Sequence, residues 1–226
     1  MRLDRVVPFG RTLKEYSQIF NLKETDFQKR ILGVGDGPAS FNAEAHQKGC
    51  QVCSIDPVYE FSADQIQSRF DEVVDDIIEQ VIETPDDWVW SFHKNPQDLR
   101  KTREKALQLF LEDYEAGKKE GRYKIGALPK LEFADNSFDL ALCSHFLFLY
   151  SAQVDYEFHR ESIYEMLRIS KEIRLFPLLT LMLEPSPHLE PLIKDLTENG
   201  YWVSIQKAGY ELQRGGNEML VVKKQA

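Results

Sequence analysis

The sequence predicts an α/β fold in which strands alternate with helices and the chain ends in a β-hairpin. Short apolar segments of strand length alternate with segments whose apolar residues recur at helical spacing. A glycine-rich loop follows the first strand, and an acidic residue ends the second. Such alternation is typical of a sheet with helices on both faces. At 226 residues and 42% hydrophobic composition, the chain can bury the core of one domain over residues 1–226.

Seven segments are predicted as strands, and the last two form the closing hairpin. The strand ranges are 30–33, 51–55, 122–125, 139–144, 172–177, 202–207 and 219–223. Apolar residues at helical spacing predict helices between them. These helices cover 12–20, 38–49, 156–167 and 188–199. Pro38 is expected in the first turn of its helix, where a missing N–H costs nothing.

The connection between the second and third strands, residues 57–122, is unusually long. A single helix with two short loops would need about 25 residues or fewer. Here two amphipathic helices are predicted, one marked by apolar residues from Ile66 to Val81 and one by apolar residues from Leu99 to Tyr114. We expect the whole segment to form a helical insertion, or lid, that covers one side of a ligand site.

The loop after the first strand reads Gly-Val-Gly-Asp-Gly-Pro-Ala over residues 33–39. Glycines at a strand end let the backbone approach a ligand closely. The N–H groups of the following helix suit a carboxylate or a phosphate. Asp56 ends the second strand, where an acid can accept hydrogen bonds from both ribose hydroxyls. Together these features predict a nucleoside-binding βαβ unit.

The loop does not match the dinucleotide fingerprint G-x-G-x-x-G. Counted from Gly33 the last position is Pro38, and counted from Gly35 it is Ser40. A nicotinamide-dependent oxidoreductase is therefore the weakest of the functional hypotheses considered for this chain.

Two runs of sequence resemble class I S-adenosylmethionine-dependent methyltransferases. Residues 31–38, Ile-Leu-Gly-Val-Gly-Asp-Gly-Pro, resemble the first motif of that family. Residues 131–145, from Leu-Glu-Phe-Ala-Asp-Asn-Ser-Phe-Asp onward, resemble the segment that enters the fourth strand, where L-P-F-x-D-x-S-F-D is usual. The resemblance covers residues 12–224. It implies a Rossmann-like, doubly wound, seven-stranded and mostly parallel sheet with a C-terminal antiparallel hairpin.

The same resemblance implies S-adenosylmethionine as the cofactor and assigns residues to it. The glycine loop approaches the amino-acid part of the cofactor, and Asp56 holds the ribose. Asp36 can replace the acid that the family usually has at the position of Gly33. Residues after the second and third strands line the adenine, and the backbone after the fourth contacts the methionine amino group. The expected cofactor-binding residues are Gly33, Gly35, Asp36, Gly37, Asp56, Pro57, Val58, Leu128 and Ser144.

His145, at the end of the fourth predicted strand, is the candidate catalytic residue. An imidazole titrates near neutrality, so it can remove a proton from a hydroxyl or an ammonium acceptor. A histidine packed in the core and bonded to the backbone is the alternative.

Four other residues are candidates for the substrate pocket. Tyr150 follows the fourth strand and can belong either to the pocket or to an aromatic core cluster. Arg174 falls inside the fifth strand, where a buried guanidinium needs a core carboxylate or an anionic substrate. Arg214 and Asn217 flank the Gly-Gly turn of the hairpin, where they can either reach substrate or remain in solvent.

Composition bounds the remaining classes. The net charge of −9 argues against an extended nucleic-acid-binding surface. The N-terminus lacks a secretory apolar run, and the longest apolar stretch, 175–183, is about half the length needed to span a bilayer. We therefore expect a cytoplasmic protein without a membrane segment. Cys50 and Cys53 are spaced as C-x-x-C but lie on opposite faces of a strand, so no metal site is expected.

The sequence is interpreted as a methyltransferase, a transferase acting on an unidentified small-molecule or side-chain acceptor. The resembled family usually has an acid at the position of Gly33, and it often has one at the position of Ala127. These departures favour an alternative, a methyltransferase-like binding or regulatory protein without turnover. The apolar face of the insertion can pack on its own sheet or on a second subunit, so a homodimer is left open.

Overall fold

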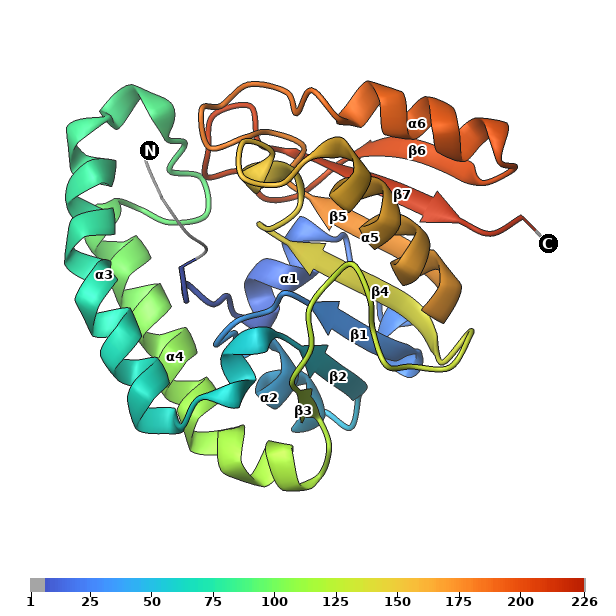
Figure 1. Ribbon diagram of the computed structural model, residues 1–226. Coiled ribbons are helices and arrows are strands. Elements are labelled where there is room, and N and C mark those ends of the chain that lie inside the picture. The colour runs from blue at the N-terminus through green and yellow to red at the C-terminus, as the bar shows by residue number, and fades with distance from the viewer. Residues whose placement is uncertain (1–6, 226) are drawn as a thin grey trace.

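A seven-stranded mixed sheet forms the centre of the molecule (Figure 1). The computed structural model describes residues 7–225. The strand order is β3-β2-β1-β4-β5-β7-β6, and β7 runs antiparallel to both of its neighbours. This arrangement confirms the predicted doubly wound sheet with its C-terminal hairpin. The strands are β1 Arg30–Val34, β2 Gln51–Ile55, β3 Tyr123–Lys124, β4 Phe138–Ser144, β5 Ser170–Phe176, β6 Trp202–Lys207 and β7 Glu218–Lys223.

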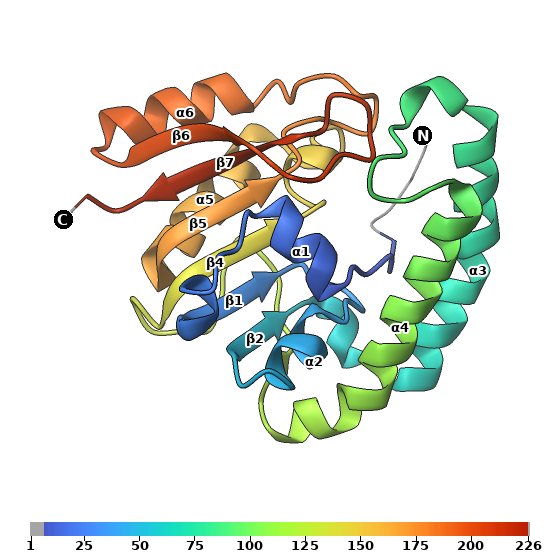
Figure 2. The same cartoon turned by 180° about the vertical axis from the view of Figure 1, so that it is seen from behind.

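Helices cover both faces of the sheet. In Figure 1, α5 lies in front of the strands, and Figure 2 shows α1 and α2 on the opposite face. The helices α3 and α4 lie side by side at one end of the strands rather than on a face. The helix bounds are α1 Leu13–Ile19, α2 Phe41–His46, α3 Ala63–Glu83, α4 Pro96–Lys119, α5 Tyr156–Ile169 and α6 Leu189–Glu198.

Two hydrophobic cores follow from the alternation of side chains along each strand. Leu140 and Leu142 of β4 face the core that includes α1, α2 and the insertion. Ala141 and Cys143 of the same strand face the second core, which includes α5 and α6. All four side chains are buried, so β4 contributes to both layers at once.

The long connection between β2 and β3 contains the two predicted helices, α3 and α4. A capping box between Ser62 and Gln65 begins α3, and the Asn95 side chain caps α4, with Pro96 at its first position. The apolar stripe of each helix packs into the core of the α1–α2 side. This hairpin faces the carboxyl ends of β1, β2 and β4 (Figure 1). It therefore covers the edge where ligands bind in parallel sheets.

The start of α2 differs from the sequence prediction. The helix begins at Phe41, three residues after Pro38, so the placement of that proline in the first turn was wrong. The chain from Gly35 to Gly37 has left-handed φ angles of 66° and 56°, and the loop bends before the helix can start. The Pro38 carbonyl faces the N-terminal segment, where a Cβ on Gly10 would lie only 2.1 Å from its oxygen.

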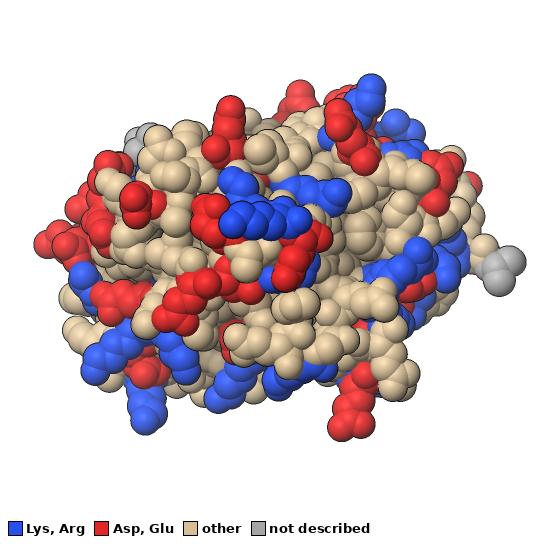
Figure 3. All heavy atoms as spheres, turned by 90° about the horizontal axis from the view of Figure 1, so that it is seen from below, with Lys and Arg blue, Asp and Glu red and all other residues tan. Residues whose placement is uncertain are grey.

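The surface carries charges of both signs. On the face shown in Figure 3, lysines and arginines are interspersed with aspartates and glutamates. Among residues 7–225, no helix combines the length and the hydropathy that crossing a membrane requires.

Candidate active site

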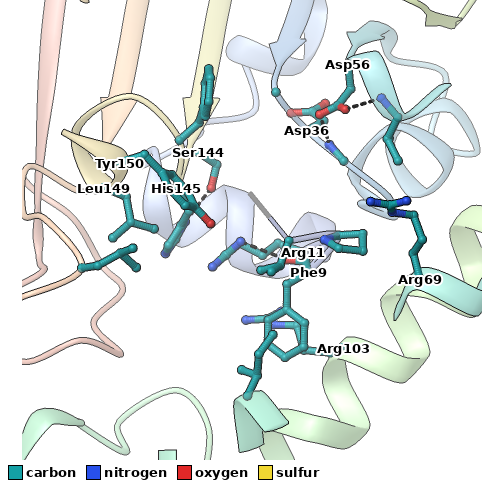
Figure 4. A pocket seen from close by; sticks show the side chains of 18 of the residues that line it. Phe9, Arg11, Asp36, Asp56, Arg69, Arg103, Ser144, His145, Leu149 and Tyr150 are labelled. Carbon is teal, nitrogen blue, oxygen red and sulfur yellow. Dashed lines mark hydrogen bonds between the residues drawn. The ribbon is translucent and has the colours of Figure 1, made fainter. Parts of the chain in front are cut away.

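A pocket of about 440 Å³ lies between the carboxyl ends of β1, β2 and β4 and the α3–α4 hairpin (Figure 4). Its wall includes the N-terminal segment, the glycine loop, the residues after β2 and β4, and part of the C-terminal hairpin connection. The lining residues include Phe9, Arg11, Tyr16, Gly35, Asp36, Gly37, Asp56, Pro57, Val58, Arg69, Ile77, Val81, Leu99, Arg103, Ser144, His145, Leu149, Tyr150, Leu181, Leu212 and Gln213.

Asp56 holds the glycine loop against the end of β2. Its carboxylate accepts hydrogen bonds from the backbone N–H groups of Gly37 and Val58, each at 2.8 Å. Burial raises the pKa of Asp56 to about 6, although the two N–H donors act in the opposite direction. Each carboxylate oxygen can accept more than one hydrogen bond, so Asp56 retains acceptor capacity toward the pocket.

Asp36 is buried beneath the glycine loop and held by two hydroxyls. Tyr16 and Ser54 each donate a hydrogen bond of 2.6 Å to its carboxylate. Burial raises the pKa of Asp36 to about 7, despite the opposing effect of these two donors. The Tyr16 ring stacks on Phe41 of α2 with ring centroids 4.2 Å apart. The stacking fixes the hydroxyl, and through it the Asp36 carboxylate.

The absent side chain of Gly33 explains where Asp36 lies. A Cβ on Gly33 would be 1.8 Å from Oδ2 of Asp36, so the carboxylate occupies the space that a larger residue 33 would need. The chain thus brings an acid to this part of the loop from three residues further on.

His145 follows β4 and adopts a left-handed conformation with a φ of 53°. Its backbone N–H donates to the carbonyl of Phe176 at 2.6 Å, which fixes the residue next to β5. Its Nδ1 lies 2.8 Å from Oγ of Ser144. Burial holds the pKa of His145 well below 6.5, and the nearby cations Arg11 and Arg103 act in the same direction. The imidazole is therefore neutral at pH 7.

A fully buried ion pair lies beside the pocket. Arg103 of α4 donates to both carboxylate oxygens of Glu15 in α1, at 2.9 and 2.7 Å. Burial alone would raise the pKa of Glu15, but Arg103 and a hydrogen bond from His93 hold it well below its ordinary value. Tyr210, on the connection before β7, completes the cluster at 3.4 Å from the same carboxylate. The cluster ties the insertion to both ends of the chain.

The structure brings most of the predicted cofactor residues together. Leu128 is outside the pocket wall, in the core of the α5–α6 side. Gly33 lies beneath the loop and does not reach the pocket wall. The predicted residues that do line the pocket are Gly35, Asp36, Gly37, Asp56, Pro57, Val58 and Ser144, together with His145 and Tyr150.

Three predicted substrate residues do not line the pocket. Arg174 donates to Glu172 at 2.7 Å and pairs with Asp26 at 3.3 Å, so it is the core ion pair that the sequence left as an alternative. Arg214 donates to the carbonyls of Asp86 and Trp88 and fastens the insertion to the hairpin connection.

Asn217 is likewise engaged elsewhere. Its side chain donates to Glu211 at 3.0 Å and accepts from Lys207 at 3.0 Å, which stabilises the connection between β6 and β7.

Several residues in or beside the pocket were not predicted from the sequence. Arg11 lies in the N-terminal segment, outside the recognised motifs and the predicted helices. Arg103 and Glu15 could have been found, because each interrupts the apolar stripe of an amphipathic helix. A charge on such a stripe indicates a buried partner, but the sequence does not show that the two partners lie 88 residues apart.

The chain resembles known proteins in both sequence and fold. No protein-family model matches the chain. An uncharacterized protein of Methanocaldococcus jannaschii is 35% identical over 226 residues, which cover 99% of both chains. The structure of mitomycin 7-O-methyltransferase has a TM-score of 0.52 at 12% identity, and the match covers 94% of this chain and 54% of that enzyme.

Magnesium protoporphyrin IX methyltransferase of Synechocystis has a TM-score of 0.46 at 12% identity, with 87% of this chain and 70% of that chain covered. The match to the Methanocaldococcus jannaschii protein extends over nearly the whole length of both chains, whereas the match to mitomycin 7-O-methyltransferase indicates the fold alone. The chain therefore belongs to the same family as the Methanocaldococcus jannaschii protein, and its fold is that of the class I S-adenosylmethionine-dependent methyltransferases.

Proposed function

We propose that this protein is an S-adenosylmethionine-dependent methyltransferase that acts on a small molecule or a flexible side chain. The observation that carries the proposal is the pocket itself. It brings the glycine loop, Asp56 and the Ser144–His145 pair to one wall, at the edge of the sheet where parallel folds bind their ligands.

The residues present fit the cofactor. A Cβ on Gly37 would meet nothing within 4 Å, so the loop faces open space. Asp56 lines that space and retains acceptor capacity for ribose hydroxyls, while Pro57 and Val58 offer an apolar surface for adenine. The cofactor would supply an activated methyl group on a sulfonium, and the protein would supply alignment of the acceptor.

His145 would contact the methyl acceptor. Its Nδ1 is engaged with Ser144, so Nε2 is the ring nitrogen left for the acceptor. Where Nδ1 carries the proton, Nε2 accepts one from a hydroxyl or an ammonium group. A pKa held below 6.5 by burial keeps this nitrogen unprotonated at neutral pH. The same low pKa limits how far the proton can be transferred, so orienting the acceptor would be a large part of its role.

The α3–α4 hairpin would act as the lid that selects the acceptor. Ile77, Val81 and Leu99 present apolar side chains from this hairpin to the pocket. An apolar wall with few polar groups suits a small organic ligand.

A second candidate is a binding or regulatory protein that retains the cofactor site without turnover. The relocation of the loop acid from position 33 to Asp36 is the observation that favours it. Methyl transfer to any acceptor would exclude this candidate, whereas binding of the cofactor fits both.

The test is isothermal titration of S-adenosylhomocysteine into the wild type, Asp56→Ala and Asp76→Ala. Asp76 is exposed on α3, outside the pocket, and is the matched control. We expect micromolar binding to the wild type and the control, with at least a tenfold loss in Asp56→Ala. A wild-type protein that binds no S-adenosylhomocysteine would contradict both candidate functions.

A further inference from the structure

We infer that Arg11 forms an anion subsite of the pocket, beside His145, that binds a carboxylate group. The inference deepens the proposed function, on which it rests for the identity of the ligand. Two ligands can bring the carboxylate: the methionine part of the cofactor, or the methyl acceptor. The chemistry of recognition is the same for both.

Arg11 has unused hydrogen-bonding capacity. Its Nη1 donates to the backbone carbonyl of Phe9 at 3.1 Å. Its Nε is buried and has no hydrogen-bond partner among residues 7–225. Within the same described range, no carboxylate lies within 4.0 Å of its guanidinium nitrogens, in contrast to Arg103. A guanidinium that pairs with nothing charged while partly buried is unusual, because burying an uncompensated charge is costly.

The neighbouring acids are already occupied. Both oxygens of Glu15 are taken by Arg103, and Thr12 donates to one of them through its backbone and its hydroxyl. Asp36 is held by Tyr16 and a serine hydroxyl on the other side of the loop. Among residues 7–225, the two arginines therefore share one glutamate, and Arg11, Arg103 and Glu15 together carry a net positive charge.

The pKa of Arg11 agrees with a net positive charge in this cluster. Burial and the proximity of Arg103 lower the pKa of Arg11 to about 10, and the attraction of Glu15 only partly offsets them. The guanidinium remains charged at neutral pH, in surroundings that favour the arrival of an anion.

The subsite is held in place rather than carried on a loose end. Gly10 packs so tightly on the glycine loop that a Cβ would lie 2.1 Å from the Pro38 oxygen. Its own carbonyl accepts a hydrogen bond from Arg103 at 3.2 Å. The guanidinium of Arg11 points toward His145 (Figure 4). An anion bound there would lie next to the residue that we place at the acceptor.

The surroundings favour a carboxylate on an apolar body. Leu149, Leu181 and Leu212 line the pocket on its apolar side. The planar guanidinium offers a pair of N–H groups that match the two oxygens of a carboxylate. One uncompensated arginine balances one such charge.

The experiment compares the wild type, Arg11→Met, Arg11→Lys and the control Lys14→Met in calorimetric titrations. Lys14 is exposed on the same N-terminal part of the chain. The probes are S-adenosylhomocysteine, 5′-methylthioadenosine, which lacks the amino-acid part, and benzoate added to protein saturated with 5′-methylthioadenosine. Thermal unfolding of each variant shows whether it is folded.

If the cofactor supplies the carboxylate, Arg11→Met lowers the affinity for S-adenosylhomocysteine at least tenfold and leaves the affinity for 5′-methylthioadenosine unchanged. If the acceptor supplies it, both nucleosides bind as before and benzoate binding is lost. Arg11→Lys retains the charge and part of the affinity in either case. Folded Arg11→Met that binds all three probes as the wild type does overturns the subsite.

Failure of the proposed function has a different signature. If the wild type binds neither nucleoside, the proposed cofactor is wrong. Benzoate titrated into the protein alone then tests the subsite independently of the cofactor. Benzoate binding that Arg11→Met abolishes would keep the subsite, and its absence would remove the subsite as well.

Discussion

The carboxylate of Asp36 lies directly over Gly33, where a Cβ would be 1.8 Å from Oδ2. The two residues exclude one another: a side chain at 33 and the observed position of Asp36 cannot coexist. The acid under the glycine loop is therefore present in this chain, but it enters from the other side of the turn, and Tyr16 and Ser54 hold it there.

Gly33→Ala should displace Asp36 from both hydroxyls. We expect a loss of about 1–3 kcal/mol in the free energy of unfolding, the usual cost of overpacking a tight core. Urea denaturation measures it. In the double variant Gly33→Ala/Asp36→Ala the clash is gone, so the two effects should be less than additive. Strict additivity would contradict the exclusion between the two residues.

Asp36 should give the protein a characteristic dependence of stability on pH. Burial raises its pKa from 3.8 to about 7, so the folded state binds a proton more tightly than the unfolded state. Its contribution is fully present below pH 3.8 and is lost as the pH rises through about 7. The difference in unfolding free energy between the wild type and Asp36→Asn should therefore fall across this range.

Asp139→Asn is the control for that measurement, because the pKa of Asp139 is shifted in the opposite direction and its contribution to stability therefore changes with pH in the opposite way. Hydrogen bonds from Arg30 and Lys171 hold the pKa of Asp139 below its ordinary value. Its contribution is present above that ordinary value and is lost as the pH falls. If the contributions of Asp36 and Asp139 to the unfolding free energy changed in the same direction with pH, the protonation of Asp36 would have been misassigned.

Arg174 should matter for stability and not for binding. Arg174→Met leaves Asp26 and Glu172 without their shared cation, and breaking a buried pair in this way costs about 3 kcal/mol. Chemical denaturation should show this loss, while the affinity of the folded variant for S-adenosylhomocysteine stays within twofold of the wild type. A large loss of affinity in a folded variant would return Arg174 to the list of pocket residues.

His145 should remain neutral at a pH where an ordinary histidine is half protonated. Burial, with Arg11 and Arg103 nearby, holds its pKa well below 6.5. Nitrogen-15 NMR of the imidazole ring follows the titration directly. Removing one of the two cations in Arg11→Met should raise the pKa of His145. An imidazolium signal for His145 at pH 6.5 in the wild type would be incompatible with the structure.

The parts of the site that could be predicted are those encoded in contiguous sequence. Gly35, Gly37 and Asp56 follow strands whose apolar character is evident, and the order of those strands places their ends together. All seven predicted strands are present, because most of them are short segments rich in apolar residues between turns. The bounds of β2 and β6 are as predicted, and those of the other five strands differ by one or two residues at an end.

The rest depends on partners that are distant along the chain. Arg174 has the same local sequence whether it faces substrate or Asp26, which lies 148 positions away. Arg214 shows the same difficulty, because the carbonyls that bind it belong to the insertion. Only folding reveals which polar groups meet, and for Arg11 the informative fact is that no acid among residues 7–225 forms an ion pair with it.

The pocket closes only where three separated segments converge. Arg103 reaches Glu15 across 88 positions, Tyr210 reaches it across 195, and Arg214 reaches Asp86 across 128. Closing such long loops is entropically costly, and contacts of this range slow folding. The glycine loop can form with the central strands, whereas the wall opposite it must await the C-terminal segment. A nascent chain that ends before residue 208 would have the motif by which the family is recognised, yet no enclosed chamber in which to use it.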